Sequence, residues 1–174
     1  MELWDIYDKN RNFTGKVIPK GTTLEKDEYR LTVRAAIFNN ENEMLIQKRQ
    51  TTKNKYPNLW DVSIAGNAVH GEISEEAIER ELFEELGIKY DFSEERPMLT
   101  IHREHGFTDF YILNLDIDIN LLKIQYEEVQ SVIWANKQEI FQLIDEGKFI
   151  PYNKAIIELL FFNKNCRGMI DNER

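Results

Sequence analysis

One segment constrains this chain more than any other, because residues 66–88 combine a helical apolar pattern with a high concentration of negative charge. Its apolar positions recur every three or four residues, and they are Ile73, Ala77, Ile78 and Leu82. Gly87 ends the pattern, and Ser74 stands where an N-cap residue is favoured. Seven residues of the segment are glutamate. The segment therefore predicts a helix that buries one apolar stripe and exposes many carboxylates.

Strand patterns lie on both sides of this helix, and two further helical patterns follow them. The expected strands cover 31–39, 43–49 (a hairpin with the first), 59–66, the two segments around a turn near Gly106 and Phe107, and 128–134. The further helices cover 137–147 and 153–165. Strands before and after a central helix, with two helices at the end, predict an α+β fold arranged as an α/β/α sandwich.

Length and composition favour a single domain over residues 1–174, with residues 1–29 as an N-terminal extension. The apolar runs are shorter than the ~20 residues that span a membrane, and the first residues do not resemble a signal peptide. We therefore expect a soluble, cytoplasmic protein without a membrane partner. A net charge of −9 argues against nucleic acid as a partner. The single cysteine, Cys166, has no nearby histidine and is not expected to be a nucleophile.

Three of the glutamates share one face near the end of the helix. Glu81, Glu84 and Glu85 are three or four residues apart, and like charges at this spacing repel by about 0.2–0.5 kcal/mol per pair. The helix dipole also disfavours negative charge at the C-terminal end. A solvated acidic face is the simplest alternative, but a bound cation between the carboxylates accounts better for this placement.

The spacing of the whole segment is that of a known motif. Gly66, Glu72 and the run from Arg80 to Ile88 follow the order Gly, five residues, Glu, seven residues, Arg-Glu-Leu-Phe-Glu-Glu-Leu-Gly-Ile. This pattern resembles the Nudix box at every specified position. The order of the predicted strands extends the resemblance over most of residues 30–164. It implies the Nudix fold, with a central mixed sheet flanked by helices.

The resemblance implies a hydrolase that splits a diphosphate bond with Mg²⁺ or Mn²⁺, which prefer oxygen ligands. The predicted metal ligands are Glu81, Glu84, Glu85 and the carbonyl of Gly66, and the predicted supporting pair is Glu72 with Arg80. The base that activates water is either Glu84 or Glu85. Glu128, or its neighbour Glu127, is a candidate for an additional ligand or base. The expected partner is a small-molecule diphosphate, and a homodimer is compatible with the family.

The N-terminal half resembles more narrowly a subgroup of the family that includes isopentenyl-diphosphate isomerases. The isomerase pattern has Ser-any-Cys-Gly-His where this chain has Ser-Ile-Ala65-Gly-Asn67. Another histidine of that pattern is replaced by Arg30. The chain thus lacks the thiol that moves the proton and two histidine metal ligands. These departures favour hydrolysis over isomerisation, while the intact Arg-Glu-any-any-Glu-Glu run argues against a catalytically silent binding module.

Substrate recognition is less strongly encoded. Lys48 and Arg49 lie at the end of the second expected strand, and Arg30 and Arg34 alternate along one face of the first. Each of these cations can bind phosphate oxygens, although surface solvation alone would explain any one of them. We therefore predict a substrate-binding set of Lys48, Arg49, Arg30 and Arg34.

Overall fold

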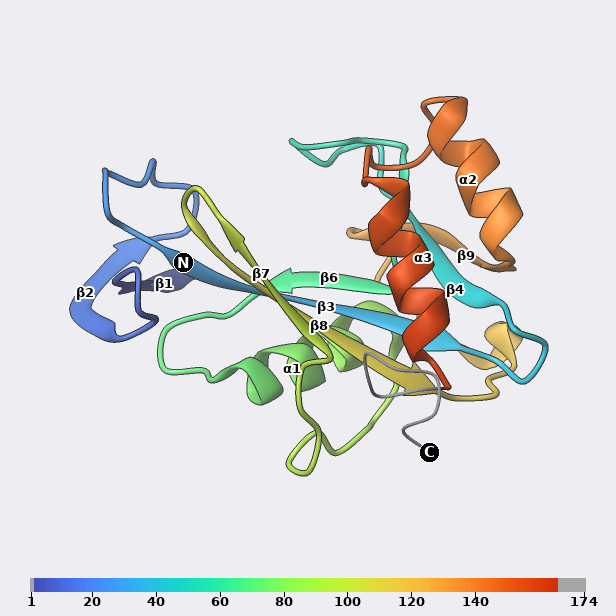
Figure 1. Cartoon of the computed structure of the whole chain (residues 1–174), viewed down its shortest axis with the longest axis horizontal. Helices are drawn as coiled ribbons and strands as arrows, with labels where there is room; N and C mark the ends of the chain where they lie inside the picture. The colour runs from blue at the N-terminus through green and yellow to red at the C-terminus, as the bar shows by residue number, and fades with distance from the viewer. Residues whose placement is uncertain (1, 166–174) are drawn as a thin grey trace.

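The computed structural model describes residues 2–165, and its central element is a seven-stranded mixed sheet (Figure 1). Its strands are β3 (Arg30–Phe38), β4 (Met44–Arg49), β5 (Trp60–Asp61), β6 (Ile64–Asn67), β7 (Leu99–Arg103), β8 (Gly106–Asn114) and β9 (Val129–Ala135). The strand order is β5-β4-β3-β8-β7, with β6 also paired to β3 and β9 to β4. Among the strand pairs of this sheet between residues 30 and 135, β3 and β8 run parallel and the other pairs are antiparallel.

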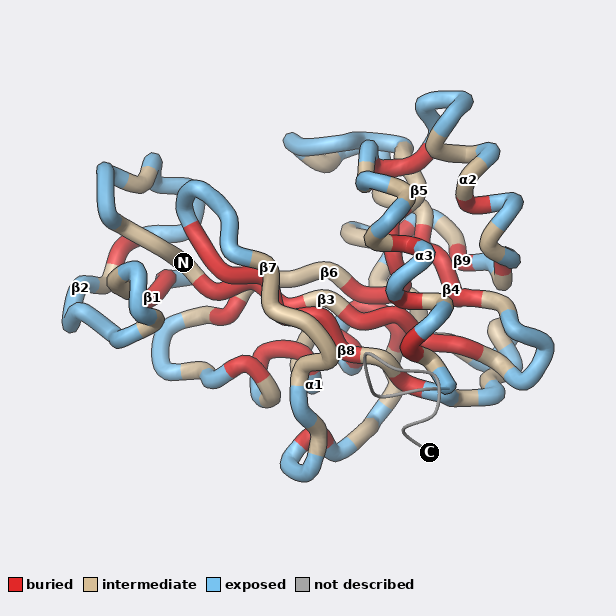
Figure 2. The backbone as a smooth tube through the Cα atoms, in the orientation of Figure 1, coloured by how far each residue is buried: buried red, intermediate tan, exposed pale blue. Residues whose placement is uncertain are grey.

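Helices cover both faces of this sheet. They are α1 (Ser74–Leu86), α2 (Lys137–Asp145) and α3 (Lys154–Asn163), with a short 3-10 turn, η1 (Ile119–Leu121). Val33, Ala35 and Ile37 of β3 belong to the core that contains the apolar stripe of α1. The alternate residues Ala36 and Phe38 belong to the core that contains α2 and α3. The α/β/α sandwich is confirmed, and Figure 2 shows the buried residues running along β3, β4 and β8.

The predicted hairpin is present, but β3 and β4 are joined only near its turn, where Phe38 pairs with Met44. Beyond that pair, β3 is paired with β6 and β8, whereas β4 is paired with β5 and β9. The single strand predicted over 59–66 is therefore wrong, since it divides between β5 and β6. Ser63 lies at the division, where its hydroxyl accepts from Ile37 N at 2.8 Å and donates to Leu45 O at 2.5 Å. The Ser63 hydroxyl thus bridges the backbones of β3 and β4 at a point where the two strands are no longer paired.

Two other local predictions need correction. The turn expected near Gly106 and Phe107 lies earlier, at 104–105, because both residues already pair with β3 and β7. Ser74 is the first residue of α1 rather than its N-cap; Ile73 takes that place, and its N–H donates to Glu76 at 3.0 Å. The hydroxyl of Ser74 is used elsewhere, as described below.

The N-terminal extension forms its own two-stranded sheet, from β1 (Leu3–Tyr7) and β2 (Phe13–Pro19). It has a small core of Trp4, Ile6 and Ile18, and it contacts the rest of the chain through a bridge between Tyr7 and Tyr29. Within residues 2–165 no helix is long and apolar enough to cross a membrane. Cys166 lies outside the described residues.

Candidate active site

Arg80, on α1, organises the region around the box. Its Nε and Nη2 donate to the two carboxylate oxygens of Glu72 at 2.6 and 3.0 Å, so the predicted pair of Glu72 and Arg80 is present as a two-point ion pair. The same guanidinium donates to the carbonyl of Asn67 at 3.0 Å. Its Nη1 lies 3.0 Å from Glu81 and 2.9 Å from Glu84. One fixed cation therefore holds the loop before α1 and two of the glutamates that follow it.

Glu81 lies directly against Gly66 of β6. A Cβ on residue 66 would overlap the Glu81 carboxyl group, so only glycine leaves room for this approach. An oxygen of Glu81 also accepts from Asn67 N at 3.3 Å. Burial raises the pKa of Glu81, and the neighbouring Arg80 opposes that shift. The requirement for glycine in the motif thus has a direct steric cause in this structure.

Glu85, one turn further along α1, is only 4% exposed. One hydrogen bond reaches its carboxylate from a side chain, donated by Gln47 Nε2 of β4 at 3.0 Å. Burial, followed by the nearby charge of Glu81, raises the pKa of Glu85 well above its usual value. Glu81 and Glu85 are thus neighbours with different surroundings: Glu81 is paired with Arg80, whereas Glu85 forms no ion pair with any residue between 2 and 165.

The remaining acidic residues of the predicted set lie differently. The side chain of Glu84 is 47% exposed and pairs with Arg80 Nη1, the nitrogen that also contacts Glu81. Glu128, just before β9, forms an ion pair with Lys53. Within the described part of the chain, no group of three or more His, Cys, Asp or Glu side chains converges as a metal site. The structure therefore places Glu81 against Gly66, with Glu84 and Glu85 as neighbouring charges on α1.

The predicted substrate-binding cations fall into separate groups. Arg34 of β3 and Arg49 of β4 share one carboxylate, that of the buried Asp61, at 3.3 and 3.8 Å. Lys48 lies apart from them, with its ammonium 6.0 Å from the centre of the Trp60 ring. Arg34 and Arg49 therefore meet where β3 and β4 diverge. Arg30 lies on the same face of β3 as Arg34 and donates to the side chain of Asn67.

A second polar centre escaped prediction from the sequence. Asp109 of β8 is fully buried, and its carboxylate accepts from Arg11, which uses both terminal nitrogens. Ser74 and Thr100 each donate a hydroxyl to it at 2.6 Å. The hydroxyl of Tyr111 in turn donates to Ser74 Oγ at 2.8 Å. Ser74 thus binds Asp109 rather than the end of its own helix, which explains why it is not the N-cap.

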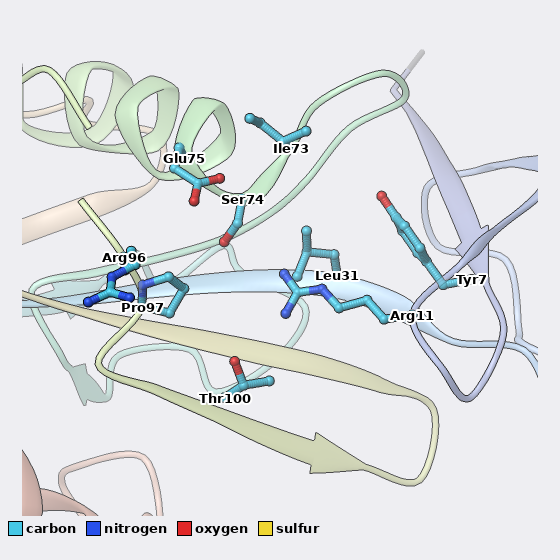
Figure 3. Close-up of a pocket in the computed structure, with 9 residues that line it drawn as sticks. All are labelled: Tyr7, Arg11, Leu31, Ile73, Ser74, Glu75, Arg96, Pro97 and Thr100. Atoms are coloured by element: carbon cyan, nitrogen blue, oxygen red, sulfur yellow. The ribbon is translucent and has the colours of Figure 1, made fainter. Parts of the chain in front are cut away.

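A pocket of about 460 Å³ opens beside this centre, between the N-terminal hairpin, the start of α1 and the segment before β7 (Figure 3). Its lining includes Arg11, Ser74, Arg96 and Thr100. A second pocket of about 710 Å³ lies along the outer face of α1, beside Phe83. Neither pocket is lined by Glu81 or Glu85. The carboxylate pair lies instead next to Gly66 and Gln47, beside the divergence of β3 and β4.

Comparison with known proteins agrees with this geometry. Residues 28–163 match the model of the NUDIX domain. The Nudix hydrolase lmo0368 of Listeria monocytogenes is 43% identical over 166 residues, which cover 95% of this chain and 97% of that protein. An isopentenyl-diphosphate Delta-isomerase of Corynebacterium glutamicum is 25% identical over 161 residues, covering 86% of this chain and 85% of that protein. The crystal structure of DR0079 from Deinococcus radiodurans superimposes with a TM-score of 0.74 at 23% identity, covering 91% and 97% of the two chains.

The chain therefore belongs to the Nudix hydrolase family. Its class of activity is that of a Nudix pyrophosphohydrolase, an enzyme that acts on diphosphate bonds in small molecules. Enzymes of this family generally use divalent metal cations.

Proposed function

We propose that this protein hydrolyses the diphosphate bond of a small organic diphosphate with Mg²⁺ or Mn²⁺ bound at α1. The observation that carries the proposal is the pair Glu81 and Glu85, two largely buried carboxylates, of which Glu81 shares the Arg80 cation with Glu84 and Glu85 accepts from the neutral amide of Gln47. The proposed ligands are Glu81, Glu85 and the Gly66 carbonyl, with Glu84 as a further ligand or as the base. Carboxylate and carbonyl oxygens are the donors that these cations prefer.

The proposed division of labour follows from the contacts of each residue. Arg80 fixes Glu81 and the Asn67 carbonyl in one arrangement, and Glu72 fixes Arg80. Gln47 orients the carboxylate of Glu85. A bound divalent cation supplies charge that attracts the diphosphate, polarises phosphorus and lowers the pKa of water. Glu84 or Glu85 would accept the proton of the attacking water, with Glu128 as the alternative base outside the helix.

The isomerase-like relative makes isomerisation the second candidate function. That reaction needs a group in the β6 region that exchanges a proton with carbon. Ala65, whose side chain is a methyl group, pairs with Arg34 at this place and has no proton to exchange. Isopentenyl diphosphate distinguishes the two activities directly, because isomerisation yields dimethylallyl diphosphate and hydrolysis yields phosphate.

The test is a substrate panel with Mg²⁺ or Mn²⁺, containing nucleotide sugars, dinucleotides, nucleoside di- and triphosphates, coenzyme A and prenyl diphosphates. We expect at least one member to release phosphate or a monophosphate product. Glu85→Gln and Glu81→Gln should each lower turnover by at least ~10²-fold, because each removes a charged ligand or base. Glu79→Gln on the same helix is the matched control and should retain turnover within about twofold. Wild-type rates in both ligand variants would overturn the assignment of α1 as the metal site.

A further inference from the structure

Three guanidinium groups gather on the face of the sheet opposite α1. Arg30 and Arg34 alternate along β3 with Thr32 between them, so all three side chains share one face. Arg103 of β7 reaches the same place, and its Nη2 donates to Thr32 Oγ1 at 3.0 Å. The side chain passes Gly106 of β8, where an added Cβ would lie 3.1 Å from that nitrogen. The three arginines come from strands that the parallel pairing of β3 with β8 brings together.

Two of these cations lack an anionic partner. Arg34 is matched by Asp61, which it shares with Arg49. Arg30 and Arg103 form no ion pair with any residue between 2 and 165. Desolvation, and then the charges of Arg30 and Arg34, lower the pKa of Arg103 to about 10. Within the described residues, the charges of Arg30 and Arg103 are thus held close together without an anionic partner, and Glu85 is buried without a cationic one.

The position of Arg30 is fixed by neutral contacts that leave its charge unbalanced. One terminal nitrogen donates to the side-chain oxygen of Asn67. The guanidinium carbon lies 4.5 Å from the centre of the Trp4 ring, which the N-terminal hairpin supplies. A side chain held by an aromatic ring and an amide is ordered in advance, so binding an anion costs it little conformational entropy.

Asn67 connects this cationic face to the carboxylate pair. Its side chain accepts from Arg30, while its backbone N–H donates to Glu81 at 3.3 Å. Arg80 holds the carbonyl of the same residue. Glu81 and Arg30 therefore contact the same residue of β6.

We propose that Arg30 and Arg103 bind the terminal phosphoryl group of the substrate, the anhydride-linked phosphate with three free oxygens at the end of an organic di- or polyphosphate. This inference rests on the proposed function. Guanidinium groups match phosphate oxygens in geometry and stay charged, and a terminal phosphoryl group offers three such oxygens with up to two negative charges. A diphosphate esterified at both ends has one charge on each phosphate and no terminal group. The enzyme should therefore prefer substrates that carry a free terminal phosphate.

A binding experiment tests the subsite without turnover. Calorimetric titration with inorganic tripolyphosphate, in EDTA to keep divalent cations away from the glutamates, compares wild type with Arg103→Gln and Arg30→Gln. We expect the dissociation constant to rise at least ~10-fold in each variant, because each loses a charged hydrogen-bond donor. Arg96→Gln removes an exposed arginine outside the cluster and should bind within about twofold of wild type. Absent binding by wild type, or equal binding by all variants, would overturn the proposal.

Kinetics then separate this inference from the proposed function. For the wild type, kcat/KM should be higher for a nucleoside diphosphate than for the corresponding nucleotide sugar, and Arg103→Gln should reduce that ratio at least ~10-fold through KM. Arg103→Lys should recover part of the loss, since it restores the charge but not the planar fork. Glu85→Gln should lose turnover yet keep tripolyphosphate binding. A protein that binds tripolyphosphate through Arg30 and Arg103 but hydrolyses nothing would refute only the proposed hydrolysis.

Discussion

Two buried carboxylates in this protein have opposite surroundings. Asp109 is fully buried and receives hydrogen bonds from Arg11, Ser74 and Thr100, so both of its oxygens are satisfied. Glu85 is almost as buried, yet its carboxylate accepts from Gln47 and has Glu81 as its neighbour. A buried charge that is fully paired has no need of a ligand. Glu85, which has no cationic partner among residues 2–165, is therefore the carboxylate to which we assign the proposed cation.

The largest effect on stability is expected from Asp109→Asn. This change removes the charge that Arg11 pairs with and places an amide where hydroxyl donors converge. Loss of one partner of a buried ion pair should reduce the free energy of unfolding by about 3 kcal/mol. Denaturant titration provides the measurement, with the exposed Asp145→Asn as a control that should cost less than about 1 kcal/mol. Equal losses in the two variants would mean that Asp109 is not a structural centre.

Cation binding should stabilise the protein through Glu85. At a Mg²⁺ concentration about 100 times the dissociation constant, linkage predicts a gain of about 2.7 kcal/mol in the free energy of unfolding. Thermal unfolding of wild type with and without Mg²⁺ measures this gain, which Glu85→Gln should abolish. In EDTA the same variant should be at least as stable as wild type, because it removes an uncompensated buried charge. A variant that still gains stability from Mg²⁺ would place the cation elsewhere.

The pH dependence of stability should reveal the burial of Glu85. The pKa of Glu85 is raised in the folded state, whereas an unfolded glutamate titrates near its ordinary value of about 4.3. Between these two pKa values the folded state binds more protons than the unfolded state. The stabilisation that results is complete below about pH 4.3, and it is lost as the pH rises through the pKa of Glu85 in the folded state. In EDTA, the melting temperature of wild type should therefore fall relative to that of Glu85→Gln as pH is raised. Parallel curves for the two proteins would contradict this account.

The smallest effect is expected from Glu84→Gln. Its ion pair with Arg80 is exposed and spans one helical turn, so its loss should change the free energy of unfolding by less than about 0.5 kcal/mol. Turnover gives the sharper result, because a loss of ~10²-fold with intact stability would mean that Glu84 acts only when substrate and cation are bound. Unchanged turnover would remove Glu84 from the proposed ligands and bases.

The fixed spacing of the box made part of this site predictable. Gly66, Glu72 and Arg80 are constrained by contacts within one loop and one helix, so their order along the chain carries the geometry. The apolar periods likewise predicted the helices and the layers, because each face of an element is buried against one neighbour. The ion pair of Glu84 with Arg80 was not predicted, since the spacing that places Glu84 near Glu81 and Glu85 also places it one turn from Arg80.

Contacts between distant segments could not be predicted in this way. Asp109 draws its partners from three other parts of the chain, and each of them is an ordinary residue in its local sequence. Arg103 reaches Thr32 only because β3 and β8 are parallel and in register, which no local pattern encodes. The division of the strand over 59–66 depends in the same way on the divergence of β3 and β4.

The contact of Arg11 with Asp109 means that residues before the family match take part in the folded domain. The family match starts at residue 28, yet the hairpin before it supplies the cation that neutralises a carboxylate in the middle of β8. The same hairpin packs the Trp4 ring against the Arg30 guanidinium. A version truncated at the family boundary would keep every residue of the box and lose both contacts. Residues 2–29 thus supply contacts on which a buried carboxylate and a sheet arginine depend, and are a part of the folded domain.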